Sequence, residues 1–228
     1  MDTSAFSPRE GALIDFVLRY GLGTNRTFRE RVLTGRTLNA VSKVTARMCR
    51  DDLLSRHPFL PPEVCFRLGG RSVRALGISH RFTQPLGPQS LPVDYATLVY
   101  VMQGAAARRR LSPSEMEEYL PWLPDDLQAS PYCLDANGRL ELIRVDLGGS
   151  PQHIARKVAT AAQRRLAIPQ IAELAARSRF QVAVVTSTSD KATQIAKVMS
   201  DADFAPGTRV HFGVVPQLAR LLLCRRSV

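Results

Sequence analysis

The sequence lacks the features that mark membrane-spanning and secreted proteins. It contains no run of about 18 apolar residues, the length that a helix needs to cross a bilayer. It starts with MDTSAFSPRE, which has neither the basic start nor the apolar stretch of a secretory signal. From these two absences we expect a cytoplasmic protein with no membrane partner.

Motifs of metal and cofactor sites are missing as well. The chain has four cysteines: Cys49, Cys65, Cys133 and Cys224. None of them has a second cysteine or a histidine at the spacing of a zinc site, so we expect buried free thiols. Neither pair of adjacent glycines, at 69–70 and 148–149, matches a dinucleotide-binding or P-loop motif. The histidines have no neighbouring nucleophile, and we expect no cofactor and no enzymatic activity.

Acidic side chains are scarce relative to basic ones. The chain has 31 Lys and Arg against 20 Asp and Glu, a net charge of +11. The net charge is +7 over residues 1–85, −3 over residues 86–130 and +7 over residues 131–228. Basic side chains displace counterions from phosphate backbones, so two basic segments favour a nucleic-acid partner.

With 45% hydrophobic and 22% charged residues, the chain has the composition of a globular protein of one or two domains. The first segment predicts three helices, two short strands and a closing helix, at residues 9–20, 24–35, 36–52, 53–57, 64–68 and 71–76. Glycines end the first two helices, and prolines lie between the strands. We expect a winged helix-turn-helix domain over residues 1–80.

The rest of the chain predicts a second, different domain. Residues 81–128 are expected to form a linker and connecting helices, with Ser112 as a helix cap. Residues 129–228 predict a hairpin of strands 132–134 and 140–145 that turns at Asn137-Gly138. Helices are then predicted at 151–166, 169–178, 189–199 and 216–224, a buried strand at 180–186 and a further strand at 209–214. The fold class is therefore α/β (α+β), with a small α/β sandwich after the winged helix.

The third helix is the best candidate for a DNA-reading element. An apolar stripe, predicted to be buried, holds Leu38, Val41, Val44, Thr45 and Met48. The residues expected to contact DNA are Arg36, Thr37, Asn39, Ser42, Lys43, Arg47 and Arg50, with Arg56 and His57 on the next strand. Ala40 is also placed on the exposed side. The alternative interpretation is a solvated helix face with incidental cations.

Residues 12–78 resemble the winged helix of plasmid replication-relaxation proteins. The similar segments are ALIDFVLRYGLGTNRTF, RTLNAVSKVTARMCRDDLLSRH and VCFRLGGRSVRALGI. The family tends to have tyrosine, x, leucine, threonine, x, x, glycine where this chain has Phe66 to Gly70, a departure from its pattern. The resemblance implies a DNA-binding protein that acts in replication, transfer or transcriptional control of a plasmid or integrative element.

The second half resembles the PD-(D/E)xK nuclease fold found in the same family. The family has glutamate, valine, aspartate, x, glycine where this chain has Arg144 to Gly148. Arg144 replaces one acid, Pro131-Tyr132 stands where another is expected, and no lysine follows at the family's spacing. Asp146 is the one carboxylate left in place. Magnesium chemistry needs clustered carboxylates, and Asp135 is a turn residue. The resemblance therefore implies a degenerate, inactive nuclease-like domain.

Such a domain is expected to serve dimerisation or an additional DNA contact. A basic helix face is the candidate for the DNA contact, and the alternative is that this face is simply solvated. The cations of that face are Arg156, Lys157, Arg164 and Arg165. Trp122 is interpreted as interdomain packing or a partner-binding hook, and the run Arg108–Arg110 as a solvated face.

The function expected from the sequence is sequence-specific binding of double-stranded DNA by a homodimer. Two alternatives remain open. One is a metal-dependent nuclease that acts at a replication or transfer origin through Asp146. The other is an accessory protein whose tail binds a relaxase or replication protein.

Overall fold

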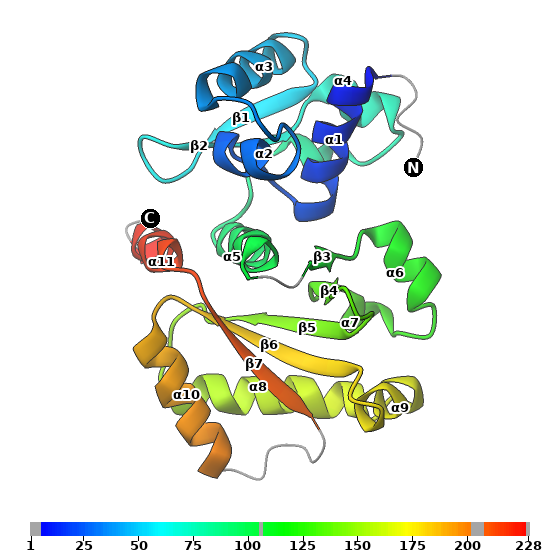
Figure 1. The fold of residues 1–228 in the computed structure, drawn as a ribbon, viewed down its shortest axis with the longest axis vertical. Coiled ribbons are helices and arrows are strands. Elements are labelled where there is room, and N and C mark those ends of the chain that lie inside the picture. The colour runs from blue at the N-terminus through cyan, green and yellow to red at the C-terminus, as the bar shows by residue number, and fades with distance from the viewer. Residues whose placement is uncertain (1–5, 105–106, 202–207, 227–228) are drawn as a thin grey trace. The chain divides into compact units, whose positions relative to one another are not determined.

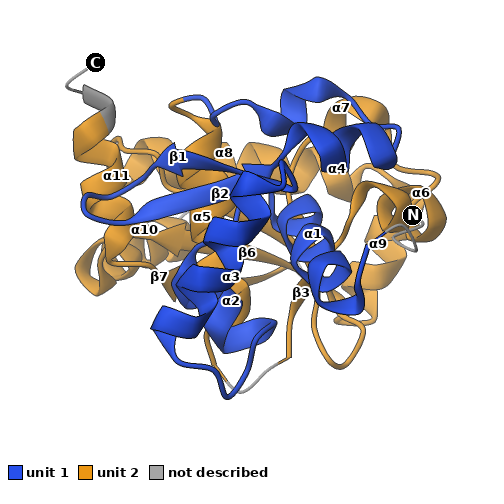
Figure 2. Cartoon of the chain, turned by 90° about the horizontal axis from the view of Figure 1, so that it is seen from above, with its two compact units in different colours: residues 1–87 blue, residues 88–228 orange. Residues whose placement is uncertain are grey.

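The computed structural model describes residues 6–104, 107–201 and 208–226. The chain divides into two compact units, residues 1–87 and 88–228 (Figure 2). Both units combine helices with a β-sheet, which confirms the α+β class. Within the described ranges, no helix has the length and apolar character needed to traverse a bilayer.

The first unit contains helices, one hairpin and a short 3-10 helix (Figure 1). Its elements are α1 (Pro8–Tyr20), α2 (Asn25–Arg31), α3 (Leu38–Arg50), β1 (Leu54–Pro58), β2 (Val64–Leu68), α4 (Gly70–Ala75) and η1 (His80–Thr83). The predicted order of elements is confirmed, and β2 has the predicted bounds. Helix α3 is shorter at both ends than predicted because Thr37 caps its start and Asp51 leaves the helical conformation.

Local hydrogen bonds explain where the first helices begin. The amide and hydroxyl of Ser7 both donate to the Glu10 carboxylate, at 3.1 and 2.7 Å. Thr24 and Thr27 form a reciprocal pair, in which each hydroxyl accepts the other's amide. Gly21, with a φ of 80°, ends α1 in the left-handed conformation. The Glu10 carboxylate and the hydroxyls of Thr24 and Thr27 thus accept amides that the start of a helix leaves unpaired.

The hairpin closes the apolar interior of the first unit. Strands β1 and β2 are antiparallel, and Gly23 adds a bridge to Phe66 through two main-chain hydrogen bonds of 3.0 and 2.8 Å. The bridge ties the loop between α1 and α2 to the hairpin. The side chains of the interior that are at most 2% exposed include Leu13, Ile14, Val17, Leu22, Phe28, Val41, Met48, Leu54 and Leu68.

The main chain just before α4 passes very close to the main chain that links α3 to β1. A Cβ at Gly69 would lie 2.2 Å from the carbonyl oxygen of Asp52, so only glycine fits there. The Asp52 carboxylate in turn accepts a 2.9 Å hydrogen bond from the amide of Gly70. The adjacent glycines therefore serve packing between the hairpin and α4.

The second unit is larger and is built around a five-stranded sheet. Its elements are α5 (Ser90–Met102), β3 (Arg109–Arg110), α6 (Pro113–Tyr119), α7 (Asp125–Gln128), β4 (Tyr132–Leu134), β5 (Leu140–Val145), α8 (Pro151–Leu166), α9 (Pro169–Ala176), β6 (Phe180–Thr186), α10 (Ser189–Asp201), β7 (Arg209–Val214) and α11 (Gln217–Arg226). The bounds predicted for β4, β5, α8, β6 and β7 are confirmed.

The sheet has the strand order β3-β4-β5-β6-β7. The first three strands are antiparallel, whereas β5, β6 and β7 are parallel. Helices α8, α9 and α10 cover one face, and α5 and α11 lie on the other (Figure 1). All seven residues of β6 are buried, as its uninterrupted apolar sequence predicted.

The structure places residues 81–128 in both units. Residues 81–87 belong to the first unit, and α5, β3, α6 and α7 belong to the second. Ser112 caps α6 as predicted, since its hydroxyl accepts the amide of Glu115 at 3.3 Å. The prediction of a solvated run at Arg108–Arg110 is wrong. Each of its side chains forms an ion pair with a carboxylate: Glu141, Glu115 and Asp94 respectively.

Candidate nucleic-acid interface

One face of α3 is exposed and carries only polar, cationic and small side chains. Its members recur at helical spacing: Asn39, Ser42, Lys43, Ala46, Arg47 and Arg50. Helix α3 contains no Asp or Glu, so none of its own carboxylates opposes an anion at this face. The face therefore presents hydrogen-bond donors and positive charge in one stripe.

The opposite face of α3 holds the helix in place. Val41, Thr45 and Met48 are at most 1% exposed. The hydroxyl of Thr45 donates a 2.9 Å hydrogen bond to Oδ1 of Asn25, in the first turn of α2. Packing and this hydrogen bond together set which side of α3 faces outward.

The start of α3 adds three exposed residues, Arg36, Thr37 and Leu38. The hydroxyl of Thr37 accepts the amide of Ala40 at 3.2 Å, and a hydroxyl that accepts one bond can still donate its hydrogen. The prediction that Leu38 is buried is wrong, because its side chain is 48% exposed. Leu38 is the first residue of the helix, one turn before the first buried position, Val41.

Two other positions of α3 differ from the sequence pattern. Ala40, predicted on the exposed side, and Val44, predicted on the buried side, are both half-buried. Both lie at the borders between the two faces, where helical periodicity alone cannot separate burial from exposure. The exposed face is therefore narrower at Ala40 than predicted.

Arg47 is held by a carboxylate of another helix. Its guanidinium lies 3.3 Å from Oε1 of Glu10 on α1. The hydrogen bond from the Ser7 side chain lowers the pKa of Glu10 most, burial opposes this effect, and the charge of Arg47 lowers the pKa further. Arg47 is thus partly neutralised, whereas Lys43 and Arg50 form no ion pair within the described part of the chain.

The two basic residues predicted on β1 point to opposite sides of the hairpin, as strand alternation requires. Arg56 is exposed, and its positive charge opposes the rise that burial causes in the pKa of the Cys49 thiol of α3. His57 is half-buried, with Nε2 3.0 Å from the carbonyl oxygen of Thr83 and 2.9 Å from the Ser55 hydroxyl. Arg56 is therefore available at the surface, whereas His57 is held by Ser55 and Thr83.

Burial also lowers the pKa of His57; the Thr83 carbonyl opposes this shift, and the charge of Arg67 adds to it. A histidine whose pKa lies below its usual value is neutral at pH 7. His57 therefore contributes no charge to this surface.

In the second unit, the residues suggested by the nuclease resemblance do not form a carboxylate cluster. Asp146 is 1% exposed, and its Oδ2 lies 2.7 Å from Nζ of Lys191 on α10. Its other oxygen accepts the amide of Gly148 at 2.8 Å. Asp135 accepts two turn amides, as predicted for a turn residue. No group of three or more potential metal ligands occurs among the residues that the structure describes. No local sequence pattern connects Lys191 with Asp146, because Lys191 lies 45 positions further along the chain.

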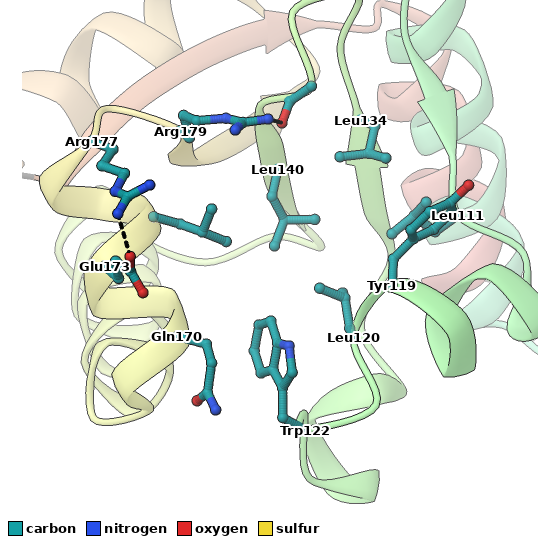
Figure 3. Close-up of a pocket in the computed structure, with 12 residues that line it drawn as sticks. Leu111, Tyr119, Leu120, Trp122, Leu134, Leu140, Gln170, Glu173, Arg177 and Arg179 are labelled. Atoms are coloured by element: carbon teal, nitrogen blue, oxygen red, sulfur yellow. Dashed lines mark hydrogen bonds and ion pairs between the residues drawn. The ribbon is translucent and has the colours of Figure 1, made fainter.

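An apolar pocket of about 440 Å³ lies between α6, α9 and the β4–β5 hairpin (Figure 3). Trp122, Leu120 and Leu140 line it, and Glu173 and Arg177 form an ion pair of 2.6 Å at its side. Trp122 also packs against the apolar core of the second unit. The residues that line the pocket include no Ser, Cys or His.

Comparison of the chain with protein-family models, with curated proteins and with solved structures found no match. The exposed face of α3 combines positive charge and hydrogen-bond donors with support from the buried side of the helix.

Proposed function

We propose that the first unit is a winged helix-turn-helix that binds double-stranded DNA in a sequence-specific manner, with α3 in the major groove. One observation supports this function above the others. The outward face of α3 carries donors and cations without a carboxylate of its own, on a helix that is fixed by a fully buried opposite face. A B-form major groove is about 12 Å wide and admits one such helix.

The side chains of this face suit both kinds of contact that a recognition helix makes. The amide of Asn39 can pair with adenine, and the cations of Lys43 and Arg50 can reach guanine or phosphate. Leu38 and Ala46 are apolar and exposed, as contact with a thymine methyl group requires. Arg56 of the hairpin supplies a phosphate contact beside the groove, in the role of a wing.

The resemblance of residues 12–78 to replication-relaxation proteins supports a role in a plasmid or integrative element. The protein then acts by binding, without catalysis, in control of replication, transfer or transcription. One recognition helix reads few base pairs, so a homodimer that presents two copies of α3 to half-sites one helical turn apart accounts better for specificity. In this proposal the second unit is a degenerate nuclease-like domain that supports dimerisation.

The double variant Lys43→Ala/Arg50→Ala is expected to bind duplex DNA about 30-fold more weakly at roughly 150 mM salt, because two cations leave the interface. The slope of log affinity against log salt concentration should become shallower by about two. Fluorescence anisotropy with duplexes selected from a random library measures both effects, and sedimentation of the same mixtures counts protomers per duplex.

The matched control is Arg177→Ala/Lys197→Ala, which removes the same charge from exposed positions of the second unit. It should change the affinity by less than about threefold. An unchanged DNA affinity of the Lys43→Ala/Arg50→Ala variant would contradict the proposal that α3 binds DNA. A library without any enriched sequence would contradict sequence specificity, and one protomer per duplex would contradict the dimer.

Glu10→Gln is expected to raise DNA affinity about twofold to fivefold. Glutamine keeps the helix cap with Ser7 but removes the charge that holds Arg47, and an exposed ion pair of this kind contributes about 0.2–1 kcal/mol. The measurement is the same anisotropy titration. Glu173→Gln, which changes the charge equally in the second unit, is the control. Equal affinities for Glu10→Gln and the control would mean that Arg47 does not contact DNA.

A further inference from the structure

The second unit contains a pocket whose lining is strongly basic. The pocket has a volume of about 450 Å³ and lies between α7, β5 and α8. Five cations line it: Arg144, Arg156, Lys157, Arg164 and Arg165. Its one carboxylate, Asp126, is already bound by Arg164 at 2.5 Å. The pocket therefore concentrates positive charge that its own acid does not balance.

Arg165 is the most deeply buried of these cations. The residue is 3% exposed, and its guanidinium donates to the Tyr132 hydroxyl at 2.7 Å and the Ser130 hydroxyl at 2.9 Å. It also donates to the carbonyl oxygens of Ala161 and Leu127. All four acceptors are neutral, so they satisfy its hydrogen bonds and leave its charge uncompensated.

Arg144 lies close to Arg165 and lacks even neutral partners. Burial lowers the pKa of Arg144 most, and the nearby charge of Arg165 lowers it further, while Tyr132 raises it. In the described part of the chain, the Arg144 side chain forms no hydrogen bond and no ion pair. A half-buried guanidinium with five idle donors is costly unless an acceptor enters.

Two further cations that line the pocket are exposed to solvent. Arg156 and Lys157 are exposed residues on α8 that follow one another along the helix. Neither forms an ion pair within the described ranges. An anion that entered the pocket would meet the donors of Arg144 from β5 and those of Lys157 from α8.

We propose that this pocket binds a phosphate group. Several converging cations favour a multiply charged oxyanion over a single carboxylate, and the planar guanidinium of Arg144 matches the geometry of phosphate oxygens. The volume accommodates a phosphate with part of an attached nucleoside or a backbone segment. The phosphate comes either from a nucleic-acid strand or from a free phosphorylated molecule, and the same donors serve both.

The test uses the full chain and the variants Arg144→Gln and Lys157→Gln, with Lys197→Gln as the matched control. Arg144→Gln removes an unpartnered side chain, and Lys157→Gln changes an exposed one, so both should fold. Trp122, the single tryptophan, packs against the core of the second unit and reports its thermal unfolding by fluorescence. A ligand that binds the folded unit raises the midpoint of this transition.

The probes are pyrophosphate, a mononucleotide and a single-stranded oligonucleotide, each compared with sulfate at equal ionic strength. All proteins also carry Lys43→Ala/Arg50→Ala, so that binding by α3 does not mask the pocket. We expect at least a tenfold loss of affinity for one or more probes in Arg144→Gln and in Lys157→Gln, and less than a twofold change in Lys197→Gln.

If the variants lose affinity only for the oligonucleotide, the bound phosphate belongs to a nucleic-acid strand. If they lose affinity for pyrophosphate or the mononucleotide, the ligand is a free phosphorylated molecule. Either result supports the pocket whether or not α3 binds DNA. Equal affinities of all the proteins for all the probes, or no binding at all, would overturn the proposal.

Discussion

Glu141→Ala should lower the free energy of unfolding of the second unit by about 3–5 kcal/mol. Glu141 is fully buried on β5, and its Oε2 lies 3.0 Å from Nε of Arg108, whose side chain is only 12% exposed. The Tyr100 hydroxyl donates to the same oxygen at 3.3 Å, and the Gln181 amide donates to Oε1. Removal of this acceptor leaves a buried cation and two buried donors without their partner.

The neighbouring groups show how strongly this carboxylate acts on its surroundings. Burial raises the pKa of Tyr100 most, and the charge of Glu141 raises it further. The same two causes raise the pKa of the Cys133 thiol. Tyr100 and Cys133 are therefore neutral at pH 7, and Arg108 carries the compensating charge.

Urea unfolding followed by Trp122 fluorescence measures the effect on the second unit. Glu173→Ala breaks the exposed pair with Arg177 and should cost less than about 0.5 kcal/mol. A double-mutant cycle of Glu141→Gln and Arg108→Met should show a coupling above about 1 kcal/mol. A loss for Glu141→Ala as small as that of the control would show that this buried pair does not stabilise the fold.

Arg67→Met should destabilise the first unit by about 3 kcal/mol. Arg67 is 7% exposed, and its guanidinium donates to three carbonyl oxygens, those of Gly21, Arg81 and Gln84. Hydrogen bonds from a charged donor contribute about 1.5–3 kcal/mol each, and methionine keeps the apolar stem while removing all three. Methionine also removes the cost of burying a cation, and this gain offsets part of the loss. Arg67→Lys should recover only part of the loss, because an ammonium lacks the planar fork of donors.

Hydrogen exchange at the amide of Phe66, which donates to the Gly23 carbonyl at 2.8 Å, provides a local measurement of this loss. An expected cost of about 3 kcal/mol corresponds to roughly a hundredfold faster exchange, since each 1.4 kcal/mol is tenfold. Arg74→Ala is the control, because its pair with Asp52 is exposed. Exchange as slow in Arg67→Met as in the control would refute the structural role of Arg67.

Local patterns in the sequence predicted most of the elements of both units. Helices and strands depend on periodicity, caps and turn residues within a few positions, and these signals are visible at Ser112, at Asn137-Gly138 and in the apolar run of β6. The errors at helix ends are of the size expected when a cap residue is counted as helical, as at Thr37.

Contacts between distant residues could not be predicted in this way. Nothing near Arg108 in the sequence indicates that Glu141 lies beside it, and Arg67 resembles any other strand cation until the carbonyls around it are known. The same limit applies to the pair of Asp146 with Lys191. The fold of the sheet or the hairpin brings each of these partners close together. A local pattern in the sequence does not indicate this proximity.

The candidate DNA-binding face lies between these two cases. Helical periodicity correctly placed Asn39, Lys43 and Arg50 on the exposed side of α3. It gave no sign that Glu10 of α1 holds Arg47. Strand alternation would have separated Arg56 from His57, because adjacent residues of a strand face opposite sides.

The parallel pairing of β6 has a consequence for the order in which the chain acquires structure. Its register joins Leu140 to Phe180 and Gln181 to Arg209, whereas the β4–β5 hairpin closes between Leu134 and Leu140. The hairpin can form early, but β6 gains its second neighbour only after β7 has left the ribosome. The sequence FQVAVVT of β6 has no charge and a high β propensity. Nascent chains therefore expose this aggregation-prone strand on one side until β7 has been synthesised.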